Sequence, residues 1–273
     1  MQYNTEKCKI CGGDCQSIFT TKVLNKYDVQ YFQCNTCRFI QTENPYWLQE
    51  SYENAITSLD LGYVMRNLFF KDIVADIINK LFDKKQSFLD YGGGYGMLVR
   101  LMRDAGYDFI RQDSYCENIF AQHFDIECVK KNSFELITCF EVFEHLAEPL
   151  AEIEKMLQHS KSILFSTTLQ PKTDINSPED WGYMAPEVGQ HIAFYSAKSL
   201  QSVTKKNGLN FYSDGKDLHL MTDKKWNFNW VKYISFAHRL LYQMQGKYFN
   251  SKHSLLYQDV DHVKQLNIYN KCK

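Results

Sequence analysis

The chain has 273 residues, a length typical of one large domain or of one large and one small domain. Apolar residues make up 44% of it, charged residues 23%, and its net charge is −1. This composition is typical of a soluble globular protein and provides no bulk positive field to attract nucleic acid. No apolar run approaches the roughly 18 residues that a membrane span needs. The amino-terminal residues lack the apolar core of a signal peptide, so we expect a cytoplasmic protein.

Five of the nine cysteines lie near the amino terminus, and four of them form two Cys-x-x-Cys pairs. The pairs are Cys8 with Cys11 and Cys34 with Cys37. Each such turn aims two thiolates at one point, and two turns complete the tetrahedral sulfur set that Zn(II) prefers. The segment between the pairs has the pattern of a hairpin of short strands. We therefore predict that residues 1–42 form a zinc ribbon.

The predicted zinc is structural, because four thiolates leave no open coordination position for a substrate. A redox dithiol and buried thiols without a metal are the alternatives. An odd number of cysteines also favours a reducing compartment over a framework of disulfides. The pattern assigns no role to Cys15.

The middle of the chain alternates between short apolar strands and amphipathic helices. Asn44 and Pro45 are predicted to open the first helix after the ribbon, as N-cap and first-turn residue. The later predicted strands cover residues 87–91, 107–112, 134–140, 162–167, 209–213 and 217–222. The later predicted helices cover about 62–82, 97–105, 146–158, 197–207 and 227–245. This alternation predicts an α/β fold, with a mostly parallel sheet between two layers of helices.

A glycine cluster follows the strand at 87–91. From Asp90 to Met97 the sequence reads Asp-Tyr-Gly-Gly-Gly-Tyr-Gly-Met, which places four glycines between a strand and a helix. Backbone without side chains can approach a nucleoside closely at the carboxyl edge of a parallel sheet. The dinucleotide fingerprint Gly-x-Gly-x-x-Gly fails, because Met97 stands where the third glycine would be. The loop therefore predicts a nucleoside site for a ligand other than NAD.

The pattern Asp-x-Gly-x-Gly-x-Gly resembles the first motif of class I S-adenosylmethionine-dependent methyltransferases. The segment Glu141-Val-Phe-Glu-His145 resembles the fourth motif of that family, with Glu141 in place of the usual Asp. The resemblance covers about residues 62–222. It implies a Rossmann-like methyltransferase domain over residues 43–273, with a helical linker before it and an extension after it. Its sheet would have seven strands, of which residues 209–222 supply the terminal pair, and its cofactor would be S-adenosylmethionine.

The resemblance also implies which residues hold the cofactor. Asp113, at the end of the second strand, is expected to accept hydrogen bonds from the ribose hydroxyls. A solvated loop aspartate is the alternative for this residue. The other residues expected at the cofactor are Asp90, Tyr91, Gly92, Gly94, Gly96, Phe140 and Glu141.

A long segment, 170–190, follows the strand at 162–167, and segments of this length inside a compact domain are usually functional. Its Trp181 and Tyr183 are expected to line the acceptor site. His191 comes next, in a segment similar to one in sugar C-methyltransferases that carry an amino-terminal zinc module. There a Glu-His pair precedes an aromatic-Ser step, and the His lies at the active site; Gln190 stands here in place of that Glu.

A histidine can accept a proton near pH 7, so we predict that His191 is the general base. A histidine that is merely bonded to the backbone is the alternative. His145, in the fourth motif, is the second candidate for direct chemistry.

The leading hypothesis is an O-methyltransferase that acts on a sugar nucleotide, a polysaccharide unit or another small cell-envelope precursor. C-methylation is less favoured, because we find no counterpart of the additional carboxyl-terminal domain of the sugar C-methyltransferases. The alternatives are an RNA-modifying methyltransferase that holds RNA with its ribbon, and a non-catalytic nucleoside-binding protein. Residues 1–42 carry a surplus of only two basic side chains, which disfavours nucleic acid as a partner. The sequence indicates no oligomeric state.

Overall fold

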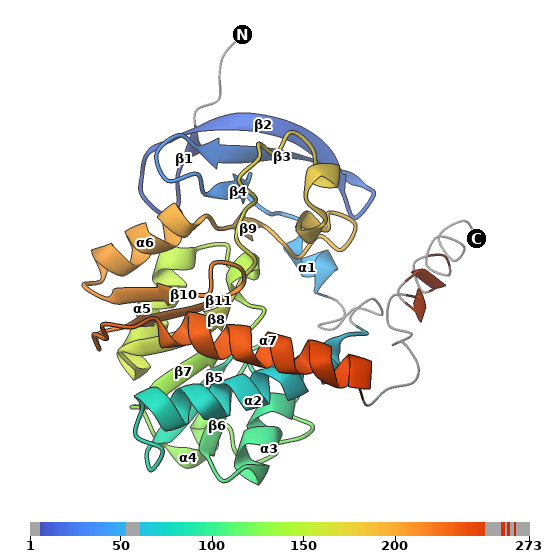
Figure 1. The fold of residues 1–273 in the computed structure, drawn as a ribbon. Coiled ribbons are helices and arrows are strands. Elements are labelled where there is room, and N and C mark those ends of the chain that lie inside the picture. Colours follow the sequence, from blue (N-terminus) through green and yellow to red (C-terminus); the bar gives the residue numbers. More distant parts are fainter. Residues whose placement is uncertain (1–5, 53–60, 249–257, 260, 263–264, 266–273) are drawn as a thin grey trace.

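The structure is a computed structural model that describes residues 6–52 and 61–248, together with 258–259, 261–262 and 265. It contains two sheets, with strand orders β1-β2-β3-β4-β9 and β10-β11-β8-β7-β5-β6 (Figure 1). The smaller sheet lies at the top of Figure 1, and the larger sheet lies below it between its helices. Within the described part of the chain, no helix is both long enough and apolar enough to cross a bilayer.

The smaller sheet is antiparallel and contains the predicted hairpin. Its strands are β1 (Glu6–Lys7), β2 (Asp14–Val23), β3 (Tyr27–Cys34), β4 (Ile40–Thr42) and β9 (Ala193–Phe194). In the β2–β3 hairpin, Cys15 pairs with Cys34 and Val23 with Tyr27. The fifth strand, β9, comes from a distant part of the chain and pairs with β4. The cysteine-rich segment therefore shares a sheet with residues that directly follow His191.

The prediction that Asn44 and Pro45 open a helix is wrong. The helix α1 (Leu48–Ser51) begins three residues after Pro45 and has Trp47 as its N-cap. Asn44 and Pro45 form the turn before it, where their carbonyls accept the N–H groups of Tyr46 and Leu48. Trp47 is almost fully buried, and its indole donates to the carbonyl of Gly189 at 2.9 Å. Burial of this large side chain, rather than local capping, sets where the chain turns into α1.

The larger sheet confirms the predicted alternation of strand and helix. Four strands form its parallel core: β5 (Ser87–Tyr91), β6 (Asp108–Gln112), β7 (Leu136–Cys139) and β8 (Ser162–Ser166). The hairpin of β10 (Asn210–Ser213) and β11 (Leu218–Thr222) joins β8 in antiparallel fashion, as expected for residues 209–222. The helices are α2 (Tyr63–Leu81), α3 (Met97–Asp104), α4 (Ile126–Val129), α5 (Pro149–His159), α6 (Ala197–Lys206) and α7 (Trp230–Tyr248). Short 3-10 turns are η1 (Phe143–His145), η2 (Pro178–Asp180) and η3 (Gly182–Met184).

Alternate residues of the strands face two separate cores, as the two-residue period of a strand requires. Phe88 and Leu136 pack with apolar residues of α2, α3 and α7. Leu89 and Ile137 point to the opposite face and pack with α5 and α6. The sheet is thus covered on both sides, which explains why its strands read as continuous apolar runs.

The expected seventh strand is absent from the described residues, where the larger sheet has six strands and β6 lies at its edge. A further strand beside β6 would need two helical crossovers and roughly 30 residues before β7. The segment 113–135 is shorter than this. It contains only the four-residue α4 and one isolated parallel bridge between Arg111 and Asp125.

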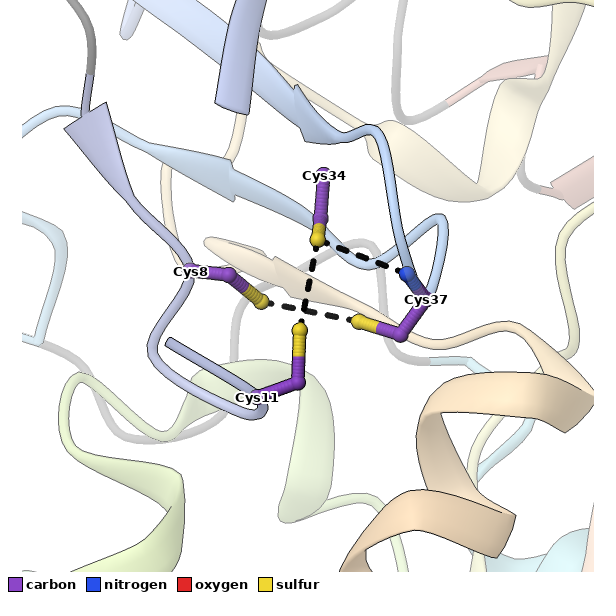
Figure 2. Close-up of side chains that lie close together, drawn as sticks. All are labelled: Cys8, Cys11, Cys34 and Cys37. Carbon is purple, nitrogen blue, oxygen red and sulfur yellow. Dashed lines mark hydrogen bonds between the residues drawn. The ribbon is translucent and has the colours of Figure 1, made fainter. Parts of the chain in front are cut away.

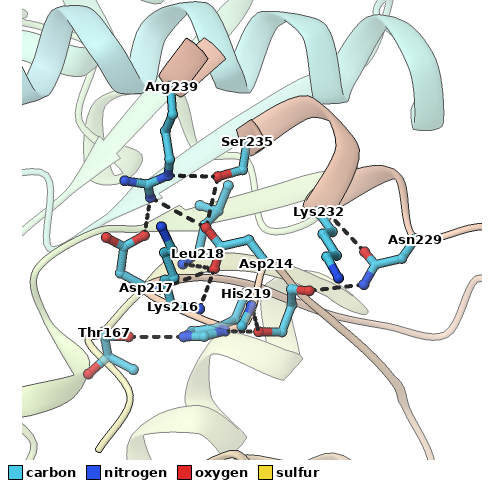
Figure 3. Close-up of polar contacts among 12 residues, drawn as sticks. Thr167, Asp214, Lys216, Asp217, Leu218, His219, Asn229, Lys232, Ser235 and Arg239 are labelled. Carbon is cyan, nitrogen blue, oxygen red and sulfur yellow. Dashed lines mark hydrogen bonds and ion pairs between the residues drawn. The ribbon is translucent and has the colours of Figure 1, made fainter. Parts of the chain in front are cut away.

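A buried polar network holds α7 against the terminal hairpin (Figure 3). On β11 the fully buried His219 bonds the Thr167 carbonyl through Nε2 and the Ser213 hydroxyl through Nδ1, both at 2.9 Å. Because a carbonyl only accepts, Nε2 carries the proton in the neutral ring. From α7, Arg239 donates to Asp217 and to Asp214. Burial lowers the pKa of His219 to about 4.

This low pKa predicts acid sensitivity. Between pH 6.5 and about 4 the unfolded chain binds a proton at His219 that the folded chain does not bind, so stability falls as pH falls through this window. In His219→Gln, the melting temperature should therefore fall less steeply between pH 6.5 and 4 than in the wild type. Thermal unfolding of both proteins in matched buffers measures the difference. Equal slopes would show that His219 is not held neutral by burial.

Candidate active site

The glycine loop joins β5 to α3, as predicted from the sequence. Gly92, Gly94 and Gly96 have φ values of 69°, 54° and 84°. Residues with a Cβ atom rarely adopt this backbone conformation. A Cβ on Gly96 would lie 2.7 Å from Oδ1 of Asn118 and 3.1 Å from the Cβ of Ala121. The loop thus needs glycine both for its backbone conformation and for its close packing.

Two predicted cofactor residues, Asp90 and Tyr91, have side chains that brace the sheet beneath this loop. Asp90 is buried and accepts a 2.6 Å hydrogen bond from the hydroxyl of Thr138 on β7. Its burial raises its pKa to about 7. The Tyr91 hydroxyl donates to Glu152 of α5, and the ring lines a groove of about 650 Å³ between α4 and α5. Because both side chains are engaged in these bonds, Asp90 and Tyr91 would contact the cofactor through their backbone atoms. These contacts stay a prediction.

Asp113 lies directly after β6 and holds the glycine loop in place. Its Oδ2 accepts from the Gly94 N–H at 2.9 Å, and its Oδ1 accepts from the N–H groups of Tyr115 and Cys116 at 2.8 and 2.7 Å. A carboxylate offers about four acceptor sites, so roughly one is left for a ribose hydroxyl. The structure therefore shows Asp113 as an organiser of the loop, beside the role predicted for it.

Phe140 and Glu141 follow β7 at the same edge of the sheet. The Phe140 ring stacks on Phe70 of α2 with centroids 4.0 Å apart. Glu141 has a φ of 56°, an unusual value for a residue with a side chain. Its backbone N–H and its Oε1 both bond the Ser166 hydroxyl, at 2.8 and 2.7 Å, which fixes it between the ends of β7 and β8.

The two predicted catalytic histidines come together with a glutamate. The ring centroids of His145 and His191 are 5.0 Å apart. One candidate ligand atom from each of Glu144, His145 and His191 lies within 4.8 Å of the other two. Glu144 precedes His145 in η1, and its carbonyl accepts the N–H of Ile192 at 2.8 Å. This backbone bond joins η1 to the segment that carries His191.

Both imidazoles are oriented by backbone carbonyls. Nδ1 of His145 bonds the Gln190 carbonyl at 3.0 Å, and Nδ1 of His191 bonds the Tyr183 carbonyl at 2.6 Å. Since the carbonyls only accept, each Nδ1 is the donor, and in a neutral ring each Nε2 keeps a lone pair. Burial and the neighbouring His191 lower the pKa of His145 to about 3. His191 can therefore be bonded to the backbone through Nδ1 and still accept a proton at Nε2.

Aromatic side chains surround the histidines. The Tyr183 ring lies 4.8 Å from that of His191 and 5.1 Å from that of Trp181. The sequence predicted these two residues near His191, and the structure brings all three together. On the other side, Tyr52 packs edge-on to His145 at 6.1 Å and stacks with Tyr115 at 5.6 Å.

Sequence reasoning missed Glu144, Tyr52 and Tyr115 as members of this site. Glu144 had a usable signal, because it lies beside His145 in the Glu-His step of the motif. Tyr52 had none, since only tertiary packing brings it to His145. Gln190, which stands for the expected glutamate, turns instead to the Ser51 carbonyl at 2.8 Å. The acidic neighbour of His191 is supplied by a different element.

The four amino-terminal cysteines converge on one point (Figure 2). Their sulfur atoms all lie within 4.8 Å of one another, with 3.5 Å between Cys8 and Cys37 and 3.4 Å between Cys11 and Cys34. A tetrahedral zinc site with Zn–S bonds of about 2.3 Å has sulfur atoms about 3.8 Å apart, so this donor set fits the metal. Backbone N–H groups of Thr36 and Cys37 donate to the Cys34 sulfur.

The cysteine cluster is tied to the elements that carry the histidines. Lys9 donates to the Ala147 carbonyl at 2.7 Å, two residues after His145. The Ser196 hydroxyl donates to the Cys37 carbonyl at 2.6 Å, and its oxygen also caps α6 by accepting from the Ser199 N–H. These bonds connect the cysteine cluster to the segment after His145 and to the segment after His191.

The model of a methyltransferase domain family matches residues 66–213, which is more than half of the chain. The chain belongs to this methyltransferase family. The matched residues include both the glycine loop and the histidine pair. No curated protein matches the sequence of this methyltransferase.

Several solved methyltransferase structures resemble this methyltransferase distantly. The mitomycin 7-O-methyltransferase MmcR is 15% identical, with 64% of this chain and 60% of that chain covered and a TM-score of 0.43. CalO1, a methyltransferase in calicheamicin biosynthesis, is 11% identical over 64% of this chain and 61% of its own, with a TM-score of 0.41. Magnesium protoporphyrin IX methyltransferase ChlM from Synechocystis PCC 6803 is 15% identical over 64% and 92%, with a TM-score of 0.39. The methyltransferase thus spans less than two thirds of the length of the first two.

The packing of the glycine loop predicts an unequal cost for two similar substitutions. Gly96 and Gly106 have φ values of 84° and 91°, but a Cβ on Gly106 would meet no atom within 4 Å. In each Ala variant the backbone strain costs about 1–2 kcal/mol, and in Gly96→Ala the crowding adds about 1–3 kcal/mol. Urea unfolding measures both costs. Calorimetric titration with S-adenosylhomocysteine should show weaker binding only for Gly96→Ala, and equal behaviour of the two variants would contradict the packing described.

Proposed function

We propose that this methyltransferase methylates a hydroxyl of a small, sugar-linked acceptor such as a nucleotide sugar or a polysaccharide unit. One observation carries the proposal. Close to Glu144 and His145, which follow β7, His191 keeps Nε2 available while its Nδ1 is fixed to the Tyr183 carbonyl. A histidine held in this way can remove a proton from a hydroxyl that approaches it. The resemblance of the His191 segment to that of sugar methyltransferases supports the choice of a sugar.

The cofactor supplies an electrophilic methyl group on a positively charged sulfur. In the proposed reaction the acceptor oxygen forms the new bond to the methyl carbon, the bond between carbon and sulfur breaks, and sulfur keeps the electron pair. The acceptor's proton passes to Nε2 of His191. The products are the methyl ether and S-adenosylhomocysteine, and the protonated His191 returns its proton to water.

The chain's own residues position these groups. We propose that Gly92, Gly94 and Gly96 pass close to the cofactor and that Asp113 uses its remaining acceptor site for the ribose. Glu141 and Phe140 lie at the next strand end and would border the methionine or adenine part. Trp181 and Tyr183 would cover the acceptor and exclude water, with His145 as the second histidine at the acceptor.

The test is turnover of S-adenosylmethionine by the purified protein with nucleotide sugars, polysaccharide fragments or RNA. We expect methyl transfer to a sugar hydroxyl, and we expect His191→Ala to lower kcat by about 10²- to 10⁴-fold, since a positioned base contributes this much. S-adenosylhomocysteine affinity should be nearly unchanged in that variant. His159→Ala is a matched control, because His159 also bonds a backbone carbonyl through Nδ1, at 3.2 Å, but lies outside the site. Turnover with RNA alone, or full activity of His191→Ala, would overturn the proposal.

We also propose that residues 1–42 are a zinc ribbon and that the zinc is structural. Cys8, Cys11, Cys34 and Cys37 would hold it, and four thiolates would close its coordination shell. The role fits the position of the cluster, which lies between β1, β3 and the chain that leads to His191. Binding energy of the metal would then stabilise the smaller sheet as it forms.

Loss of one cysteine should therefore affect folding before chemistry. Cys34→Ser should reduce bound zinc to well below one per chain and lower the melting temperature by several degrees. Cys128→Ser is the control, because Cys128 is exposed and lies outside the cluster. Metal analysis of protein purified under reducing conditions measures the zinc. Wild-type protein without zinc would contradict the ribbon assignment.

A further inference from the structure

We propose that Glu144, His145 and His191 form a second metal site, which binds a divalent cation next to the acceptor. The inference deepens the proposed function, because the cation would take over the activation of the acceptor hydroxyl assigned above to His191 alone. It concerns a site separate from the cysteine cluster, with different ligand atoms and a different purpose.

The geometry of the three side chains is the first support. One potential ligand atom from each residue lies within 4.8 Å of the other two, and no rearrangement of elements is needed to bring them together. Ligands at about 2.0–2.2 Å from a common ion lie roughly 3 Å apart in an octahedral site and 3.5 Å apart in a tetrahedral one. Rotation of side chains by a small amount closes the remaining distance. The histidines come from separate segments, which the bond from the Ile192 N–H to the Glu144 carbonyl holds together.

The second support is the state of Glu144. Its side chain is fully buried, and neither carboxylate oxygen has a hydrogen-bond partner among the described residues. Burial raises the pKa of Glu144, and the nearby His191, Tyr183 and Thr167 side chains oppose this shift only in part. The Tyr183 and Thr167 hydroxyls lie 3.3 Å from each other, and neither bonds the carboxyl. A buried carboxyl without a partner costs several kcal/mol and is rare in proteins. A cation at this point gives the carboxylate the partner that the protein itself does not provide.

The third support is the way in which the histidines are held. A histidine that binds a metal almost always donates its other ring N–H to a carbonyl, a carboxylate or water. Both His145 and His191 meet this condition, with Nδ1 on the carbonyls of Gln190 and Tyr183. The rings are thus held in the tautomer that leaves an Nε2 lone pair free to bind a ligand. Two imidazoles oriented by backbone carbonyls, next to one carboxyl group without a hydrogen-bond partner, are the arrangement expected of a metal site.

The donor set also indicates the class of ion. Two imidazoles and one carboxylate suit Mn²⁺, Fe²⁺, Co²⁺ or Zn²⁺, and three protein ligands leave coordination positions open. The four thiolates of the ribbon are softer ligands and select zinc. Glu141 is a second buried carboxyl group close enough to interact with both Glu144 and His191. The surroundings are therefore suited to a doubly charged cation.

A cation here would change how the acceptor loses its proton. A hydroxyl beside a divalent cation becomes more acidic, in the way that metal-bound water does. The proton then leaves to water, the acceptor oxygen attacks the methyl carbon, and sulfur keeps the electron pair of the broken bond. His191 serves as a ligand in this arrangement. The preferred acceptor is consequently one whose oxygen can enter an open coordination position.

Mn²⁺ titration of the full-length protein carrying one zinc per chain, which the four thiolates hold, tests the site directly. Mn²⁺ is the probe because it is a poor competitor for thiolates, and its free form has a six-line electron paramagnetic resonance spectrum that is lost on binding. We expect one bound Mn²⁺ per chain in the wild type. Glu144→Gln and His145→Ala should each weaken the binding by at least about 100-fold, since even the outer partners of metal ligands contribute 10- to 100-fold. His159→Ala is the matched control and should bind as the wild type does.

Each result decides the inference separately from the proposed function. Absence of Mn²⁺ binding to the wild type, or binding that is equal in all variants, overturns the second metal site. If the protein still methylates a sugar hydroxyl in that case, the proposed function stands with His191 as the base. Conversely, binding that depends on Glu144 and His145, without turnover of any hydroxyl acceptor, supports the site and overturns the function. Circular dichroism confirms folding of each variant, and His145→Ala keeps the test valid if Glu144→Gln does not fold.

Discussion

The pairing of β4 with β9 is the constraint on which the candidate active site depends. Ile40 lies opposite Phe194 and Gln41 opposite Ala193, so the cysteine-rich sheet includes the two residues that begin just after Ile192. This pairing fixes the backbone next to His191 relative to the smaller sheet. The bond from the Ile192 N–H to the Glu144 carbonyl then fixes it relative to η1. The smaller sheet thus supports the segment that carries His191.

The buried carboxyl group of Glu144 is the second organising feature. An unpaired carboxyl in a protein interior is costly, and here it lies between two histidines that the backbone has already oriented. Such a cost is tolerated where it serves binding or catalysis. The same region holds the positive φ of Glu141, and both features lie at the carboxyl ends of β7 and β8. An unusual backbone conformation and an unpaired buried carboxyl therefore both lie at the edge of the sheet where methyl transfer is proposed.

The glycine loop, in contrast, is held by hydrogen bonds from neighbouring side chains. Asp113 and Asp90 hold the loop through hydrogen bonds to the Gly94 N–H and to the Thr138 hydroxyl. Arg111, almost fully buried, adds bonds to the Gly94 carbonyl and to Asp125. The loop is thereby organised by the protein itself. Such preorganisation lowers the cost of ordering the loop when the cofactor binds.

Local signals in the sequence determined much of this protein. The apolar strands, the glycine loop and the cap at Ser196 depend on short-range periodicity and on backbone conformations that few residues adopt, so their places were predictable. The paired cysteines likewise predicted one cluster, because each Cys-x-x-Cys turn brings its own two thiols together. His191 and Tyr183 were predicted as neighbours because they are close in the chain and share one segment.

Tertiary structure alone decided the rest. Burial of Trp47 against Gly189 placed α1, where local capping rules predicted an earlier start. The predicted seventh strand is absent from the described residues, because the connection between β6 and β7 is too short to contain a strand and two helical crossovers. Glu144 became the acidic neighbour of His191, and Tyr52 came to His145, through contacts between distant segments. Such contacts depend on how whole elements pack, and no pattern within a single segment of the sequence encodes them.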